Sequence, residues 1–443
     1  MEARDLIVTP VWIVIIYAVA YLIRPKVTDE VNRVYFIPAL TVKILGALAV
    51  GLVYQFYYNG GDTFNYHTYG SRPISEAFMD SPLKWFKLVF GDGKDETGIY
   101  KYASRIAFWK DSSSYAVVRV ASIFDLFTFS TYSATAILFA VFSFVGMWLL
   151  FTTFYDTYPS RHVLLAIAMF FIPSVFFWGS GLLKDTLTLG AVGMGTFAIH
   201  RLFILHRFSF FHFLLLGIAF VGLYEIKLYI LLALLPSSIL WVFLENLESV
   251  RSTVLKAMLY PLVIFAAVGI ASIAMLKASE DNVKYSVSTI AKTAQITAYD
   301  IRYYTGKDAG SGYSLGELDG SFNSMLRLAP QAVNVSLFRP YLWEVNNPLM
   351  LLSAMESMFF LAATIFVLFR ENVRILRVLT RPDVFFSLIF SITFAFAVGV
   401  STYNFGTLVR YKIPMLPFFA LALILIAHYS KRERNVGVFE VTE

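Results

Sequence analysis

The sequence predicts an all-α protein, a polytopic bundle of about 11 transmembrane helices with amphipathic surface helices in its first large external loop. Composition gives the first reason. Of the 443 residues, 58% are hydrophobic and only 15% are charged, and the mean hydropathy is +0.66. No water-soluble domain of this length has a core large enough to hide so many apolar side chains. Lipid must therefore cover much of the surface.

Long apolar runs give the second reason, because a helix needs about 17–25 such residues to cross the hydrocarbon. The runs lie near residues 7–23, 35–57, 132–154, 162–180, 186–204, 208–224, 228–244, 257–276, 349–369, 383–402 and 412–429. They show no repeat of fixed period, so we interpret residues 1–443 as a single integral membrane domain. The chain has no cysteine, which excludes disulfides and thiolate metal sites.

Lysine and arginine residues set the orientation, because they gather in every second short loop. They are Arg24, Lys26 and Arg33, then Arg161, Arg201, Arg207, Arg251, Lys256, Arg370, Arg374, Arg377, Arg381, Lys431, Arg432 and Arg434. Basic loops stay in the cytoplasm, so we expect a bacterial cytoplasmic (inner) membrane protein. Its N-terminus lies outside and its C-terminus inside.

The opposite loops share one external face, and two of them are large, residues 58–131 and 277–348. In the first, apolar residues recur at helical spacing, which is typical of helices that lie on a membrane surface. These segments are 74–90, 100–109 and 115–129. In the second, the stretch 306–320 has the composition of a linker, and a mobile lid is the alternative.

The stretch Asn59–Gly70 is the first candidate functional segment. It follows an apolar run directly, so Asp62 is expected about one helical turn outside the hydrocarbon, within reach of a lipid head group. Tyr66 shares a helical face with Asp62, and His67 can move protons near neutral pH. Asp62 and His67 are candidate catalytic residues, and Tyr66 is a candidate substrate contact. The alternative is a polar cap that ends a helix.

Two short connections bring lysines to the same face. Lys184 and Asp185 lie between two runs with almost no loop, where a lysine can hold a phosphate as a point charge. The alternative is an adjacent pair that snorkels to the interface. Lys227, between the next two runs, either adds a second cation or belongs to a solvated turn. Lys43, inside the second run, is expected to snorkel inward.

The end of the second large loop carries an arginine beside aromatic residues. Arg339 offers a planar fork suited to phosphate or carboxylate, and Glu344 follows it closely. Trp343 fits a sugar-stacking platform. An ordinary interfacial anchor is the alternative for this segment.

The last outer loop places Asn404, Arg410 and Lys412 close together in the sequence, which makes a compact anion site. The histidines do not have metal-ligand spacing, so no metal ligands are predicted. A divalent cation is left open as a cofactor.

These groups fit the transfer of a sugar from a lipid phosphate. A carboxylate deprotonates the attacking hydroxyl, while arginine and lysine stabilise the departing phosphate as its charge grows in the transition state. A phosphate is a good leaving group once a cation stabilises its negative charge, so a general acid is not required.

An acidic residue in the first large external loop, flanked by surface helices and followed by many helices, resembles the GT-C class of polyprenyl-phosphate-dependent glycosyltransferases. Segments 338–344 and 404–417 are similar to stretches in bacterial polysaccharide (O-antigen) polymerase-like membrane proteins. The resemblance implies that Asp62 is the base and that Lys184, Arg339, Arg410 and Lys412 hold the phosphate. In that class the acid is often paired with a second acid, whereas Asp62 stands alone here.

We therefore expect a membrane glycosyltransferase of cell-envelope polysaccharide or glycoconjugate assembly. Its partners are a polyprenyl-(di)phosphate-linked sugar donor, a glycan or lipid acceptor on the external face, and membrane lipids. The sequence has no soluble basic domain, so we do not expect the protein to bind nucleic acid. Two alternatives stay open. One is a transporter or flippase of a lipid-linked or anionic solute, and the other is a non-catalytic subunit of an envelope complex.

Reporter fusions test the expected orientation. A reporter placed after Gly98 or after Ser311 should show an external location, and one placed after Arg377 a cytoplasmic one, because basic loops resist translocation. A pair of enzymes, one active only outside and one active only inside, measures the side. A cytoplasmic result after Gly98 or Ser311 would overturn the shared external face.

Overall fold

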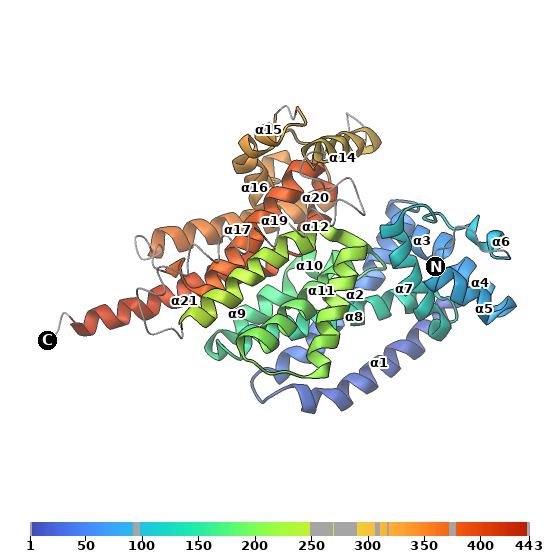
Figure 1. Cartoon of the computed structure of the whole chain (residues 1–443), viewed down its shortest axis with the longest axis horizontal. Coiled ribbons are helices and arrows are strands. Elements are labelled where there is room, and N and C mark those ends of the chain that lie inside the picture. The colour runs from blue at the N-terminus through green and yellow to red at the C-terminus, as the bar shows by residue number, and fades with distance from the viewer. Residues whose placement is uncertain are drawn as a thin grey trace. The chain divides into compact units, whose positions relative to one another are not determined.

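The computed structural model of the chain describes residues 2–91, 98–248, 269, 290–305, 311–316, 319–371 and 378–440. Every regular element in these ranges is a helix, which confirms the all-α fold class (Figure 1). Seven helices are long and apolar enough to cross a membrane, or eight if the bent pair Phe405–Tyr411 and Leu416–Lys431 is one span. These helices indicate a multi-pass membrane protein.

The seven candidate spans match most of the predicted apolar runs. They are Asp5–Val27, Arg33–Tyr57, Tyr132–Thr157, Lys184–Ile204, Phe210–Leu247, Pro348–Arg370 and Pro382–Thr402. The run 162–180 is broken instead into α9 (His162–Ala166), the π-helix η4 (Ile167–Phe171) and α10 (Pro173–Trp178). The break falls at Pro173, because a proline has no N–H to continue the preceding helix.

The runs 208–224 and 228–244 lie in one element, α12 (Phe210–Glu248), whose backbone leaves helical geometry at Lys227 (φ −146°, ψ 76°). The run 257–276, except Gly269, lies outside the described residues, as do Arg251, Lys256, Arg374, Arg377 and part of the segment 306–320. The count of about 11 helices and the orientation therefore stay predictions.

Contacts within the chain divide it into two compact units. Unit 1 comprises Met1–Ala198 and Phe210–Leu228, and unit 2 comprises Ile199–Ser209 and Tyr229–Glu443. The single integral membrane domain stays a prediction. Each unit is described by itself below.

Unit 1 is built on four long helices and the first part of α12. The long helices are α1 (Asp5–Val27), α2 (Arg33–Leu52) with its π-helical extension η1 (Val53–Tyr57), α8 (Tyr132–Tyr155) and α11 (Lys184–Ile199). The 3-10 turn η3 (Pro159–Arg161) follows α8. Every residue of α11 from Asp185 to Ala198 is buried, so α11 is the central helix of this unit.

Helix α11 approaches α8 at backbone distance. A Cβ added to Gly146 on α8 would lie 2.1 Å from the carbonyl oxygen of Gly190 on α11. Only glycine permits such an approach, as is common where membrane helices pack closely.

Short helices connect α2 to α8. They are α3 (Asp62–Tyr66), the π-helix η2 (His67–Ser71), α4 (Arg72–Asp80), α5 (Pro82–Phe90), α6 (Tyr100–Ala103) and α7 (Ser112–Thr128). Helix α4 contacts α5, α6 and α7, and Figure 1 shows them gathered together. Whether they lie on a membrane surface stays a prediction.

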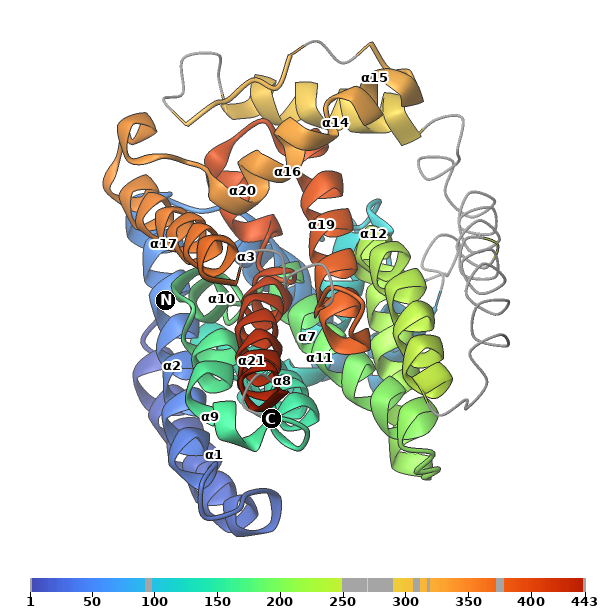
Figure 2. The same cartoon turned by 90° about the vertical axis from the view of Figure 1, so that its left-hand side faces the viewer.

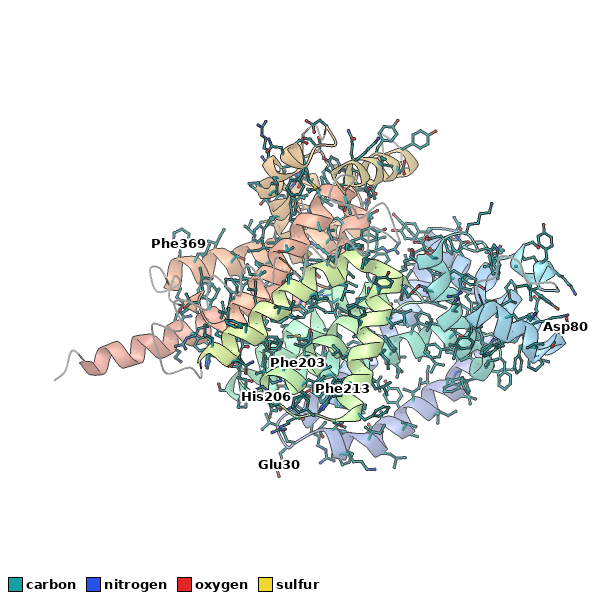
Figure 3. All side chains as sticks on the ribbon, viewed as in Figure 1. Glu30, Asp80, Phe203, His206, Phe213 and Phe369 are labelled. Carbon is teal, nitrogen blue, oxygen red and sulfur yellow. The ribbon has the colours of Figure 1, made fainter. Side chains whose placement is uncertain are left out.

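Unit 2 centres on α19 (Pro382–Thr402), which packs against α16 (Ala329–Phe338) and α21 (Leu416–Glu440). Its other described elements are η5 (His200–Ile204), the part of α12 from Tyr229 on, α14 (Ile290–Thr305), α15 (Phe322–Arg327), η7 (Leu342–Glu344), α17 (Pro348–Glu371) and α20 (Phe405–Tyr411). Helices α14 and α15 lie next to α19 and α16 (Figure 2). Phe369 points outward from the end of α17 and is 84% exposed, as expected of a lipid-facing side chain (Figure 3).

Candidate functional site

A glycine turn positions Asp62. Gly60 (φ 130°) and Gly61 (φ 116°) adopt positive φ values that favour glycine, and Asp62 follows them as the first residue of α3. The Asp62 side chain is half-buried. Its charge acts weakly on Lys184, at the start of α11, less than the charges of Asp111 and Lys227 do. The fold thus brings together two predicted site residues that are far apart in the sequence.

Lys184 is held in place by the residues that precede and open α7. Its Nζ donates to Ser113 Oγ at 2.7 Å and lies 3.4 Å from Asp111 Oδ2. The Lys184 side chain is 19% exposed, and that of Asp111 is 53% exposed. Burial alone would raise the pKa of Asp111, but the Ser114 hydroxyl and the Lys184 charge hold that pKa below its usual value. We call Asp62, Asp111, Ser113 and Lys184 the Lys184 cluster.

Asp185, the next residue, points the other way and forms a buried ion pair. Its Oδ1 lies 2.5 Å from Lys227 Nζ, and the two side chains are only 1% and 7% exposed. Lys227 sits where α12 leaves helical geometry. Both residues are candidate substrate contacts from the sequence, and that role stays a prediction. The structure shows them paired with each other. The pair keeps two charges compensated inside apolar surroundings.

Tyr66 and His67 lie in the interior of unit 1. The Tyr66 ring packs on Phe108 with centroids 4.9 Å apart. His67 is fully buried, with Nε2 3.5 Å from Asp125 Oδ1 on α7. The Asp125 carboxylate also accepts hydrogen bonds from Ser71 and from Thr135 of α8.

This buried network ties η2, which directly follows α3, to α7 and α8. Burial would raise the pKa of Asp125, but His67 and the two hydroxyl donors hold it below its usual value. The structure gives His67 a place in the scaffold behind Asp62, and its catalytic role stays a prediction.

Lys43 is a buried cation that also supports the cluster. Its Nζ donates to Ser143 Oγ at 3.0 Å, to the Gly179 carbonyl at 2.8 Å and to the Val175 carbonyl at 3.3 Å. The side chain points inward, as expected, and ends in the protein interior with the residue 1% exposed. By holding the end of α10, it fixes the short connection that leads into Lys184.

In unit 2, Arg339 is clamped by Glu344. The guanidinium donates from Nε to both Glu344 oxygens, at 3.1 and 3.0 Å, and from Nη2 to Oε1. Burial would raise the pKa of Glu344, but Arg339 and the Tyr341 backbone N–H keep it below its usual value. Trp343 is 77% exposed and stacks on Tyr341, with ring centroids 4.7 Å apart.

The last outer loop supplies a helix cap and a buried cation. Asn404 Oδ1 accepts from the Thr407 N–H at 3.1 Å, and its Nδ2 donates to Ser311 Oγ at 3.0 Å, so Asn404 caps α20. Lys412 is 1% exposed, and its Nζ donates to Ser357 Oγ at 3.1 Å. Arg410 is half-buried on α20.

The predicted site residues therefore form two groups, one in each unit. Asp62, Tyr66, His67, Lys184, Asp185 and Lys227 belong to unit 1, and Arg339, Trp343, Glu344, Asn404, Arg410 and Lys412 to unit 2. A single site that uses both groups stays a prediction.

Sequence reasoning missed two members of the cluster, Asp111 and Ser113. The signal that could have found them is the helix start at Asp111, an acid followed by serines, which is typical of an N-terminus. Among the residues that the structure describes, no group of three or more His, Asp or Glu side chains could hold a metal ion.

No protein-family model, no curated protein and no solved structure matches this chain. The resemblance to GT-C glycosyltransferases and to polysaccharide polymerases consequently stays a prediction. The case for a function depends on the geometry of the described residues.

The buried ion pair yields a stability prediction. Lys227→Met should lower the free energy of unfolding by about 3–5 kcal/mol, because it leaves the Asp185 carboxylate buried without its cation. The double variant Asp185→Asn/Lys227→Met should regain most of that loss, since no charge remains to be compensated. Unfolding of the detergent-solubilised protein measures both. Equal losses in the single and double variants would contradict the pairing.

Proposed function

We propose that the protein is a membrane glycosyltransferase and that the Lys184 cluster is where the lipid-phosphate donor meets the attacking hydroxyl. The observation that carries this proposal is the placement of Lys184, whose ammonium Ser113 and Asp111 hold at the start of a candidate membrane span, in the same unit as the part-exposed carboxylate Asp62. A base and a phosphate-binding cation are the two groups that this transfer requires. Lys184 begins a candidate membrane span, a suitable depth for the phosphate of a membrane lipid.

Each group has a definite part in the transfer. Asp62 takes the proton of the acceptor hydroxyl, whose oxygen then bonds to the anomeric carbon of the sugar. The bond between that carbon and the phosphate oxygen breaks, and its electron pair leaves with the phosphate. Lys184 stabilises the growing negative charge. Among the residues that the structure describes, Ser113 and Asp111 accept from two of the three N–H groups of its ammonium, and a phosphate oxygen can accept from the third.

Asp111 and Ser113 act as positioning residues in this scheme. They hold the lysine side chain, which otherwise has many rotamers, in one place before the donor arrives. The remaining parts of the proposal follow the sequence. They are a polyprenyl-(di)phosphate donor, a glycan or lipid acceptor, an inner-membrane location with the cluster on the external face, and about 11 spans with surface helices.

A transporter or flippase is the second candidate, and the buried Asp185–Lys227 pair favours it. Ionisable residues inside membrane spans often mark the path of a solute or a proton. A transporter would use Lys184 to bind an anionic head group without breaking a bond. Product formation separates the two candidates.

Asp62→Asn tests the proposal. The amide keeps the shape and turn propensity of the carboxylate but cannot take a proton, so turnover should fall by about two to four orders of magnitude while stability is unchanged. Turnover is measured as sugar transfer from a polyprenyl-phosphate-linked donor to extracted acceptor. Asp80→Asn is the matched control, because Asp80 lies in the same unit, paired with Lys84 on the exposed end of α4 (Figure 3).

The control variant should retain full activity. A stable and fully active Asp62→Asn protein would rule out Asp62 as the base. A wild-type protein that moves a lipid-linked solute across vesicle membranes but forms no glycosidic product would be a transporter.

A further inference from the structure

The Asp125 carboxylate lies at the centre of a buried polar site in unit 1 that the proposed transfer does not use. Its side chain and that of His67 are both fully buried. In the part of the chain that the structure describes, no lysine or arginine contacts this carboxylate. Burying a charge without a counter-charge is costly, so a positive charge has to balance Asp125.

Five hydroxyl groups from η2, α4, α7, α8 and the turn between the last two gather around the carboxylate. They belong to Ser71, Ser75, Thr128, Ser130 and Thr135. Ser71 Oγ and Thr135 Oγ1 donate to the carboxylate at 2.6 and 2.7 Å, and two serine hydroxyls contact it more loosely, at 3.4 Å. Thr128 Oγ1 lies 2.6 Å from Thr135 Oγ1. A hydroxyl that donates its proton keeps its lone pairs, so these oxygens can also bind a cation.

His67 has the geometry of a ligand to an ion at this site. Its Nε2 lies 3.5 Å from Asp125 Oδ1, and neither ring nitrogen has a hydrogen-bond partner among the described residues. A protonated imidazole would donate from both nitrogens. Two atoms that bind one cation at about 2.4 Å each, at a right angle, lie about 3.4 Å apart. The observed separation therefore fits two ligands of one ion.

We propose that Asp125, His67 and the surrounding hydroxyls bind a sodium ion. One carboxylate balances one positive charge, whereas a divalent ion would leave excess charge in the protein interior. Oxygen ligands suit hard cations, and sodium, which is close to calcium in size, forms bonds of about 2.4 Å. Only two of the ligands are His or Asp side chains, so the site does not match a transition-metal centre.

The ion holds the segment behind Asp62 in place. It joins η2 to α7 and α8, and η2 directly follows the short helix α3 that begins with Asp62. Sodium binding needs no assumption about the chemistry at Lys184. The inference is therefore independent of the glycosyltransferase proposal, and each can fail without the other.

Equilibrium binding of radioactive sodium to the purified full-length protein in detergent tests the inference. The wild type should bind a single ion per chain, displaced by excess NaCl but not by N-methylglucamine chloride. Thr135→Val removes one oxygen ligand and nearly keeps the shape of the side chain, so the sodium affinity should fall about tenfold.

Thr153→Val is the matched control, because Thr153 is also fully buried on α8 and its hydroxyl donates to the Leu149 carbonyl, outside this site. It should bind sodium like the wild type. Equal sodium affinities in the two threonine variants would overturn the inference. So would a wild type without saturable sodium binding, the result expected if a protonated His67 or a buried water molecule fills this role.

A second measurement on the wild type covers the case in which Thr135→Val does not fold. Saturating NaCl should raise the Tm by about 2–4 °C relative to N-methylglucamine chloride at the same ionic strength, because the ion binds the folded state. An equal Tm in the two salts would overturn the inference.

Discussion

The ion pair between Asp185 and Lys227 fixes how charges are arranged in unit 1. Both side chains are almost fully buried between apolar helices. Burying an unpaired charge there costs free energy, so the two side chains form an ion pair with each other. The pairing joins the start of α11 to the point where α12 leaves helical geometry. Asp185 is turned inward, and its neighbour Lys184 instead contacts Ser113 and Asp111.

Other buried charges in the described residues obey the same constraint and form the scaffold. The Lys43 ammonium donates hydrogen bonds to a hydroxyl and two carbonyls. The Asp125 carboxylate lies beside His67 and accepts hydrogen bonds from two hydroxyls. Arg339, in unit 2, is half-buried and is engaged by Glu344. The contacts of the buried Lys43 and Asp125 hold the ends of α10 and η2, whereas Asp62 and Lys184 stay partly exposed. The candidate chemistry therefore sits on charges that the scaffold does not fully enclose.

The sequence was sufficient to predict the helical class and most spans, because length and apolar composition are local properties. It also singled out Asp62 and Lys184 as candidate site residues, a role that stays a prediction. Which charged side chains pair with each other was not predictable from the sequence. Asp185 contacts Lys227, and Lys184 contacts Asp111, only after helices that are distant in the sequence pack together. The run 162–180 was predicted as one helix because its apolar composition outweighed Pro173, whose missing N–H breaks the run.

If Lys184 binds the phosphate of a membrane lipid, as proposed, Lys184→Met removes the cation that holds it. The affinity for a polyprenyl phosphate should fall about tenfold or more, because one charged hydrogen bond contributes roughly 1.5–3 kcal/mol. Lys84→Met is the control, since Lys84 is also paired with an aspartate in unit 1 but belongs to α5. It should bind like the wild type. An unchanged affinity in Lys184→Met would contradict the account.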